Sequence, residues 1–179
     1  MLGSLEERGL YRQRGLELFI HDGGQGLIAA LDYLYPTIPH QRCAFHKLRN
    51  LWHSIQIPDS LTANERQHFR REILQQAQAI FYVHNASHAA HIRQGLIDQF
   101  QNTQPQFIAT LNRDWLETIA FFQVLIRFPD WQRTALRTTS LLERVNRMLR
   151  RLFRPKATFH SITGLQATVT RVLNPIRLI

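Results

Sequence analysis

Apolar side chains near the start of the chain follow two different spacings. Residues 15–24 place four apolar residues in a run of five and end in Asp22 and two glycines, which predicts a strand buried on both faces. Residues 25–35 carry apolar side chains at helical spacing up to Pro36, and residues 41–45 form a second short strand candidate. A strand, a helix and a strand with short connections predict a parallel βαβ unit with a right-handed crossover.

The remainder of the chain has a helical pattern. Residues 61–128 show no convincing strand, and Thr62 and Glu65 have the spacing of a capping box. Further helices are predicted over residues 2–12, 84–100, 108–126, 140–152 and 165–173, with breaks near 102–106 and at Pro129. Strands followed by a long helical block predict an α/β fold that is predominantly helical by content, with a large all-α insertion in a sheet domain.

Composition narrows the class of protein. The 179 residues are 44% hydrophobic and 20% charged, which is typical of a globular domain and excludes a disordered chain. No apolar run approaches the roughly 18 residues of a membrane span, and the single cysteine excludes an intramolecular disulfide. We therefore expect a cytoplasmic protein with no membrane partner.

The positive charge is concentrated at one end of the chain. There are 22 basic and 13 acidic side chains, and residues 131–179 hold ten of the basic side chains with a single acid, Glu143. Most of the basic residues are arginine, whose planar fork matches phosphate oxygens. This distribution indicates a nucleic-acid-binding protein. The alternatives are a solvated basic face or an arginine-rich composition set by a G+C-rich genome.

Asp22 is the first candidate for chemistry, because it closes a predicted strand and precedes Gly23 and Gly24. The carboxyl ends of strands in open α/β sheets are where ligands bind, and a carboxylate there can hold a divalent metal through its oxygens. The structural alternative is that Asp22 caps the following helix or forms an Asx turn before the glycines.

Glu143 is the second candidate carboxylate. Its side chain could close a capping box with Ser140, pair with Arg147 one turn later, or share a metal with Asp22. In the third case the flanking arginines would hold the phosphates on either side of the reacting bond. The face of this helix that we expect to be buried consists of Leu142, Val145, Leu149 and Leu152.

Cys43 and His46 form a C-x-x-H pair at the end of the second strand candidate. Other histidines could in principle complete a zinc shell, namely His40, His53, His84, His88 and His91. The second pair of ligands that zinc sites usually have at a fixed spacing is missing. A buried structural cysteine–histidine pair is therefore favoured, and zinc is not expected.

Three segments stand in a characteristic order: DGGQGL from Asp22, PHQRCAFHKLRN from Pro39, and RTTSLLERVN from Arg137. In this order and spacing they resemble the C-terminal half of the Mutator-type transposases of bacterial insertion sequences. The resemblance runs from about Leu5 to Arg154, and Ser140 stands where the family usually has asparagine.

The resemblance implies a ribonuclease-H-like fold with an Asp-Asp-Glu triad that holds Mg²⁺ or Mn²⁺. By motif match, Asp22 is the second aspartate and Glu143, 121 positions later, is the glutamate, with the helical insertion between them. The resemblance also implies metal-dependent cleavage and transfer of DNA strands. The partners would be element-end and target DNA, and the acting form would be a homo-oligomer.

The same resemblance assigns roles to further residues. The family motif residues Cys43, His46, Arg49 and Asn50 would be structural. The DNA contacts would come from Arg137, Arg144, Arg147, Arg150 and Arg151. The chain would divide into a partial ribonuclease-H-like part at residues 1–52, a helical insertion at 53–130, and a catalytic-type helix with a basic tail at 131–179.

The first aspartate of the triad has no counterpart, because residues 1–21 contain no Asp. We therefore expect a truncated transposase that is inactive alone and associates with the bacterial nucleoid. One alternative is a non-catalytic nucleic-acid-binding or assembly module. Another is an all-α scaffold without a nucleic-acid role.

Overall fold

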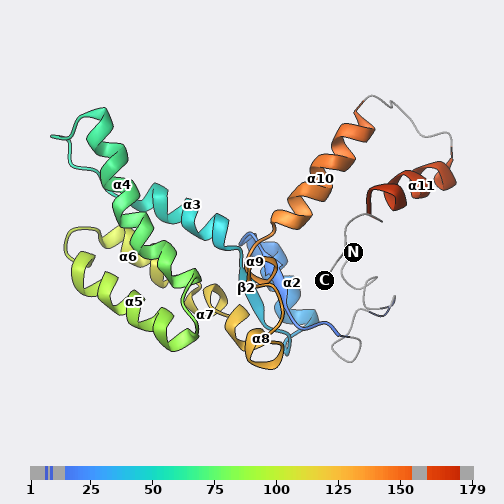
Figure 1. Cartoon of the computed structure of the whole chain (residues 1–179), viewed down its shortest axis with the longest axis horizontal. Coiled ribbons are helices and arrows are strands. Elements are labelled where there is room, and N and C mark those ends of the chain that lie inside the picture. The colour runs from blue at the N-terminus through green and yellow to red at the C-terminus, as the bar shows by residue number, and fades with distance from the viewer. Residues whose placement is uncertain (1–6, 8, 10–14, 155–160, 174–179) are drawn as a thin grey trace. The chain divides into compact units, whose positions relative to one another are not determined.

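A computed structural model describes residues 7, 9, 15–154 and 161–173 (Figure 1). The chain divides into two compact units, Met1–Thr138 and Thr139–Ile179, and each is described by itself. The helix predicted over residues 2–12 falls almost entirely outside the described residues. No helix in the described ranges combines the length and the apolar character that crossing a membrane requires.

The predicted strand–helix–strand unit is present in the first unit. Strand β1 (Phe19–His21) pairs in parallel with β2 (His40–Arg42), with Ile20 opposite Gln41, and α2 (Gln25–Leu34) connects them. The second strand ends three residues earlier than predicted, because Ala44 already begins the next helix. The order of elements and the parallel pairing confirm the predicted βα core of an α/β fold.

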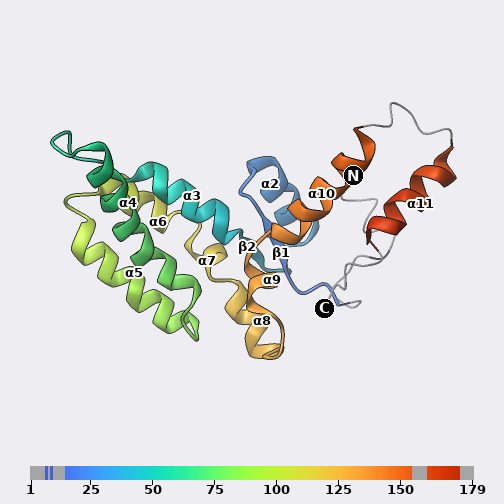
Figure 2. The same ribbon diagram turned by 45° about the horizontal axis from the view of Figure 1, so that its top comes forward.

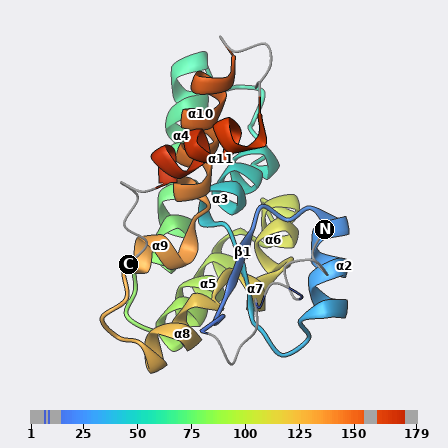
Figure 3. The same cartoon turned by 90° about the vertical axis from the view of Figure 1, so that its right-hand side faces the viewer.

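Helix α2 packs beside β1 through a small apolar cluster (Figure 3). Leu31 and Tyr35 are its buried members at the end of the helix, and the Tyr35 ring lies 5.0 Å from that of Phe19. Phe19 and Ile20 are only half-buried. The prediction of a strand buried on both faces is therefore wrong for these two residues, because the described sheet has two strands and leaves part of β1 uncovered.

After β2 the chain forms a block of helices. The structure describes all of residues 61–128, and this stretch contains no strand, as predicted. Figure 2 shows α4 and α6 beside α3, with α5 next to α4 and α6. The elements are α3 (Ala44–Ser54), α4 (Ala63–Gln78), the 3₁₀ helix η2 (Ala79–Phe81), α5 (Ala86–Phe100), α6 (Pro105–Asn112), α7 (Trp115–Thr118), α8 (Phe121–Arg127) and α9 (Arg133–Arg137).

Local signals set the starts of two of these helices. The Glu65 carboxylate accepts a hydrogen bond from the backbone N–H of Thr62 at 2.8 Å, which confirms the predicted capping box of α4. The Asn85 side chain accepts from the N–H of His88 at 2.9 Å and starts α5 at Ala86. His84 therefore precedes this helix.

The core of the first unit lies among these helices. Phe107 and Phe121 are fully buried, and Leu51, Ile80 and Leu111 are 1% exposed. These side chains come from α3, η2, α6 and α8, so the apolar faces of the block close on one shared interior. A core of this kind contributes most of the free energy of folding, at about 25 cal/mol for each Å² of apolar surface removed from water.

The prediction of one helix over residues 108–126 is wrong, because three short helices occupy this stretch. Asp114 has a left-handed backbone (φ 55°) and ends α6. A second break separates Thr118 from Phe121, and the buried Gln41 side chain fills it. Its amide donates to the Thr118 carbonyl at 3.0 Å and accepts from the Phe121 N–H at 2.8 Å. Side-chain hydrogen bonds thus replace the helical ones that the break removes.

The second unit contains α10 (Ser140–Phe153) and α11 (Ile162–Leu173), which pack against each other. Helix α10 matches the predicted position, and α11 begins three residues earlier than predicted. None of the 14 residues of α10 is buried. Leu142 is 59% exposed and Leu152 is 39% exposed, so the prediction that they belong to a buried face is wrong. The half-buried side chains of α10 instead include Val145 and Leu149, because the apolar stripe is covered only in part.

Candidate functional site

Asp22 lies at the carboxyl end of β1 and is exposed. Its Oδ1 accepts a hydrogen bond from the backbone N–H of Gly24 at 3.2 Å, so the predicted Asx turn is present. This turn fixes the direction of the carboxylate at the strand end. It leaves the metal hypothesis open, because a carboxylate has several lone pairs.

The turn after β1 is also held by the residue that precedes Asp22. Nδ1 of the buried His21 accepts from the backbone N–H of Gly23 at 3.1 Å, which requires an unprotonated Nδ1. Burial lowers the pKa of His21 below its usual 6.5, and the nearby Arg42 and His40 lower it further. The neutral imidazole is thus an internal part of the turn that carries Asp22.

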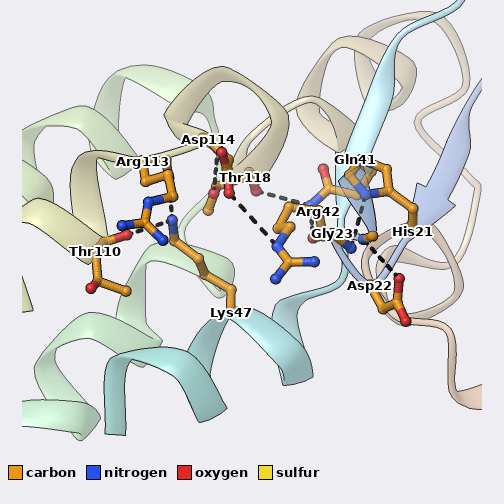
Figure 4. Close-up of polar contacts among 11 residues, drawn as sticks. His21, Asp22, Gly23, Gln41, Arg42, Lys47, Thr110, Arg113, Asp114 and Thr118 are labelled. Atoms are coloured by element: carbon orange, nitrogen blue, oxygen red, sulfur yellow. Dashed lines mark hydrogen bonds and ion pairs between the residues drawn. The ribbon is translucent and has the colours of Figure 1, made fainter. Parts of the chain in front are cut away.

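Arg42, the last residue of β2, lies against the same turn (Figure 4). A Cβ placed on Gly23 would lie 1.9 Å from Nη1 of Arg42, so only glycine leaves room for this guanidinium. Gly23 also has a φ of +96°, a conformation that residues with a side chain rarely adopt. Parallel pairing thus brings Asp22, Gly23 and Arg42 together at one sheet edge.

A second buried cation lies one helical turn along α3. Lys47 is 2% exposed, and its Nζ donates to the carbonyl oxygen of Thr110 at 2.8 Å and to that of Arg113. Burial lowers the pKa of Lys47 to about 8. Asp114 follows these carbonyls and lies 3.9 Å from Nε of Arg42. The two cations therefore join the sheet edge to the end of α6.

The role of Arg42 was not predicted, although a signal was available. An arginine inside a predicted strand must be paired or bound when the strand is buried, because burying a lone charge is costly. Lys47 carries a similar signal, because it shares the apolar face of its helix with Ala44 and Leu51. What each cation contacts could not be derived from the sequence, because the contacts come from residues far along the chain.

Cys43 is fully buried and precedes α3, and its N–H donates to the His21 carbonyl at 2.8 Å. His46 is half-buried, and its Nδ1 is enclosed without a hydrogen-bond partner among the described residues. Arg49 and Asn50 are exposed on α3. Within the described ranges, no group of three or more histidine, cysteine or acidic residues could hold a metal ion. The predicted structural role of the pair stays a prediction.

Glu143 lies in the first turn of α10 and is exposed. Its Oε1 accepts a hydrogen bond from the Thr139 hydroxyl at 2.9 Å, and its N–H donates to the Thr139 carbonyl. The residue that caps α10 is thus Thr139, one position before the Ser140 of the predicted capping box. Among the described residues no ion pair joins Glu143 to Arg147.

The five arginines predicted to contact DNA fall into two groups. Arg137 is 7% exposed; its Nη1 donates to the Phe81 carbonyl and its guanidinium lies 4.4 Å from the centre of the Tyr82 ring. This guanidinium is therefore engaged inside the first unit. The other four are all exposed on α10: Arg144, Arg147, Arg150 and Arg151. Asp22 and Glu143 belong to different units, and their sharing of a metal stays a prediction.

Residues 1–177 match the family described as "Transposase, Mutator family". This chain belongs to the Mutator family of transposases. The transposase for insertion sequence element IS406 from Burkholderia multivorans is 34% identical over 159 residues, 88% of this chain and 37% of that protein. The transposase for IS1201 from Lactobacillus helveticus is 25% identical over 169 residues, 94% of this chain and 41% of that protein.

A third relative, the transposase for insertion sequence element IST2 from Acidithiobacillus ferrooxidans, is 31% identical over 134 residues, 73% of this chain and 40% of that protein. The chain thus spans about two fifths of the length of these curated relatives. The predicted family is confirmed.

Proposed function

We propose that this chain is part of a transposase that cleaves and transfers DNA strands in the movement of an insertion sequence. The observation that carries the proposal is the family match over residues 1–177, with exposed carboxylates at the two positions that the family motif selects. Asp22 follows a parallel strand, and Glu143 lies in the first turn of an arginine-rich helix. The proposal takes these two residues as acids of a ribonuclease-H-like site.

The residues present suit a hard divalent cation. Asp22 and Glu143 are both exposed, and their carboxylate oxygens are the ligands that Mg²⁺ and Mn²⁺ prefer. Such ions activate a hydroxyl and stabilise the leaving oxygen in phosphodiester chemistry. The chain's own contribution is to fix the direction of the Asp22 carboxylate, through the turn hydrogen bonds at Gly23 and Gly24.

The exposed arginines of α10 support binding of the DNA backbone. Four guanidinium groups lie within two turns of helix, and phosphate contacts of this kind are independent of base sequence. Each contact to phosphate steepens the dependence of affinity on salt concentration. DNA binding by this surface is thus measurable without any cleavage.

The test of binding uses the full chain and a labelled duplex at a series of salt concentrations. Replacing Arg147 and Arg151 with Gln should reduce the slope of log K against log[salt] by about 2, since each phosphate contact contributes about 0.9. The matched control replaces Arg71 and Arg113, which are exposed in the first unit, and should leave the slope unchanged. Equal salt-dependence slopes for the two variants would contradict the proposal that the arginines of α10 contact the DNA backbone.

The test of catalysis supplies the carboxylate that residues 1–21 lack. With Mg²⁺ we expect residues 1–179 by themselves to leave element-end DNA intact, because residues 1–21 contain no Asp. A hybrid that carries the upstream part of the Burkholderia multivorans relative before this chain should cleave, and Glu143→Gln in the hybrid should abolish cleavage while leaving metal-free DNA affinity unchanged. A hybrid that binds DNA and never cleaves would support the non-catalytic binding module, which the exposed arginines also suit.

A further inference from the structure

The N-terminus of α2 presents unused hydrogen-bond donors. The helix has ten residues, no acidic residue in its first turn, and a glycine, Gly24, at the cap position without a side-chain hydrogen bond. Within the described chain, no acceptor takes the N–H groups of Gln25 or Gly26, and both residues are exposed. Free N–H groups and the helix dipole make such an end positive and suited to an anion.

A buried cation lies beside the residue that precedes this helix end. Arg42 is 5% exposed, and its guanidinium lies against Gly23, directly before the cap of α2. Its Nε and Nη1 are enclosed without a hydrogen-bond partner in the described part of the protein. The only charge paired with it there, Oδ2 of Asp114, lies 3.9 Å from Nε, beyond hydrogen-bond distance. Buried guanidinium donors normally have acceptors.

We propose that Arg42 and the N-terminus of α2 form a site for one phosphodiester group of a nucleic-acid backbone. A phosphate presents several acceptor oxygens, which suit a forked guanidinium together with two backbone N–H groups. The assignment to a nucleic-acid backbone rests on the proposed function, whereas the anion site itself rests only on these donors. The site would place a backbone phosphate next to Asp22.

The charge of the nearby Asp22 carboxylate should affect the affinity of this site for phosphate. Without a metal, its negative charge opposes a bound phosphate, because like charges at short range repel. Asp22→Asn keeps an Oδ1 to accept from the Gly24 N–H and removes the charge. We therefore expect this variant to bind phosphate more tightly than the unaltered chain when no metal is present.

The experiment follows backbone amide resonances of the full chain during titration with a thymidine dinucleotide, which has a single phosphodiester, and separately with inorganic phosphate, both without metal. The N–H resonances of Gln25 and Gly26 and the Arg42 Nε–H resonance should shift and saturate with the dinucleotide. No saturating shift at these groups would overturn the proposal. Saturation with inorganic phosphate but not with the dinucleotide would overturn the assignment to a nucleic-acid backbone.

A charge variant separates binding from folding. Gln25→Glu places a carboxylate in the first turn of α2, which favours the helix and should weaken dinucleotide binding at least about tenfold. The matched control, Gln76→Glu on the exposed side of α4, changes the net charge equally and should leave affinity unchanged. Equal affinities for the two variants would contradict the site.

Arg42→Lys keeps the positive charge and removes the forked guanidinium. It should therefore weaken dinucleotide binding, whereas the Gln76→Glu control should not. The Arg147 and Arg151 variant tests the proposed DNA surface and should bind the dinucleotide like the unaltered chain. Failure of the DNA surface and failure of the phosphodiester site therefore give different results.

Discussion

The two units of this chain use arginine and apolar residues in opposite ways. In the first unit, Phe107 and Phe121 are fully buried, and Arg42 and Arg137 are buried with them. In the second unit, α10 buries no residue and exposes its arginines. The first unit thus has its own interior to stabilise it, whereas the helix pair of the second removes little apolar surface from water. Arginine side chains are thus enclosed in the first unit and exposed in the second.

The largest effect that we expect from this difference is in hydrogen exchange. Amides of α6 and α8 should exchange at least about a thousandfold more slowly than those of α10, because they open only when the core does. The measurement is native-state exchange followed by mass spectrometry or NMR. Similar protection in α8 and α10 would contradict the contrast between the units.

A pair of leucine substitutions sharpens the comparison. Leu111→Ala should cost about 2–5 kcal/mol of unfolding free energy, because its side chain is 1% exposed and a cavity would remain. Leu149→Ala in α10 should cost less than about 1 kcal/mol, because that residue is only half-buried. Denaturant unfolding measures the first change through tryptophan fluorescence, since Trp52, Trp115 and Trp131 all lie in the first unit. Helical circular dichroism measures the second.

A glycine pair tests the turn that holds Asp22. Gly23→Ala should destabilise the first unit by roughly 2–4 kcal/mol, because its φ of +96° and the nearby Arg42 both exclude a Cβ. Gly26→Ala, three residues along, should instead stabilise by about 0.5–1 kcal/mol. Nothing lies within 4 Å of a Cβ there. A stabilising effect of Gly23→Ala would contradict this description of the turn.

The smallest expected effect is a pH dependence of the first unit. Burial lowers the pKa of His21 below 6.5, so the neutral imidazole contributes stability that is fully present above pH 6.5 and lost as pH falls through the lowered value. Tryptophan-monitored unfolding of the protein and of His21→Asn should therefore converge as the solution is acidified from pH 7.5. His88→Asn, an exposed control, should run parallel to the unaltered chain at every pH. If the unfolding free energies of the protein and of His21→Asn differed by the same amount at every pH, His21 would not contribute to the pH dependence of stability.

Local patterns predicted the elements that local interactions determine. The strand–helix–strand order and the Thr62–Glu65 capping box follow from neighbouring residues, and both are confirmed. The break in the helix predicted over residues 108–126 could not be predicted, because the partner of Thr118 and Phe121 is Gln41, about 80 residues earlier. The burial of α10 was predicted incorrectly for a similar reason: periodicity identifies an apolar face and not what covers it.

The candidate site shows the same division. Asp22 at a strand end and its turn with Gly24 were predictable from the order of strand, acid and glycine. The contact of Arg42 with Gly23 could not be predicted, because it depends on the register of two parallel strands, which a single sequence does not specify. The sharing of a metal by Asp22 and Glu143 stays a prediction, which the hybrid cleavage experiment addresses.

The side chains of Gln41, Arg42 and Lys47 meet the chain again at residues 110–121. The segment between these two sets of contacts, residues 48–109, therefore leaves the end of the sheet and returns to it as one long excursion of the chain. Such a segment can lengthen or shorten at its far turns at small entropic cost, because closure entropy grows only slowly with loop length. Changes of length at these far turns should therefore leave the strand end that carries Asp22 in place.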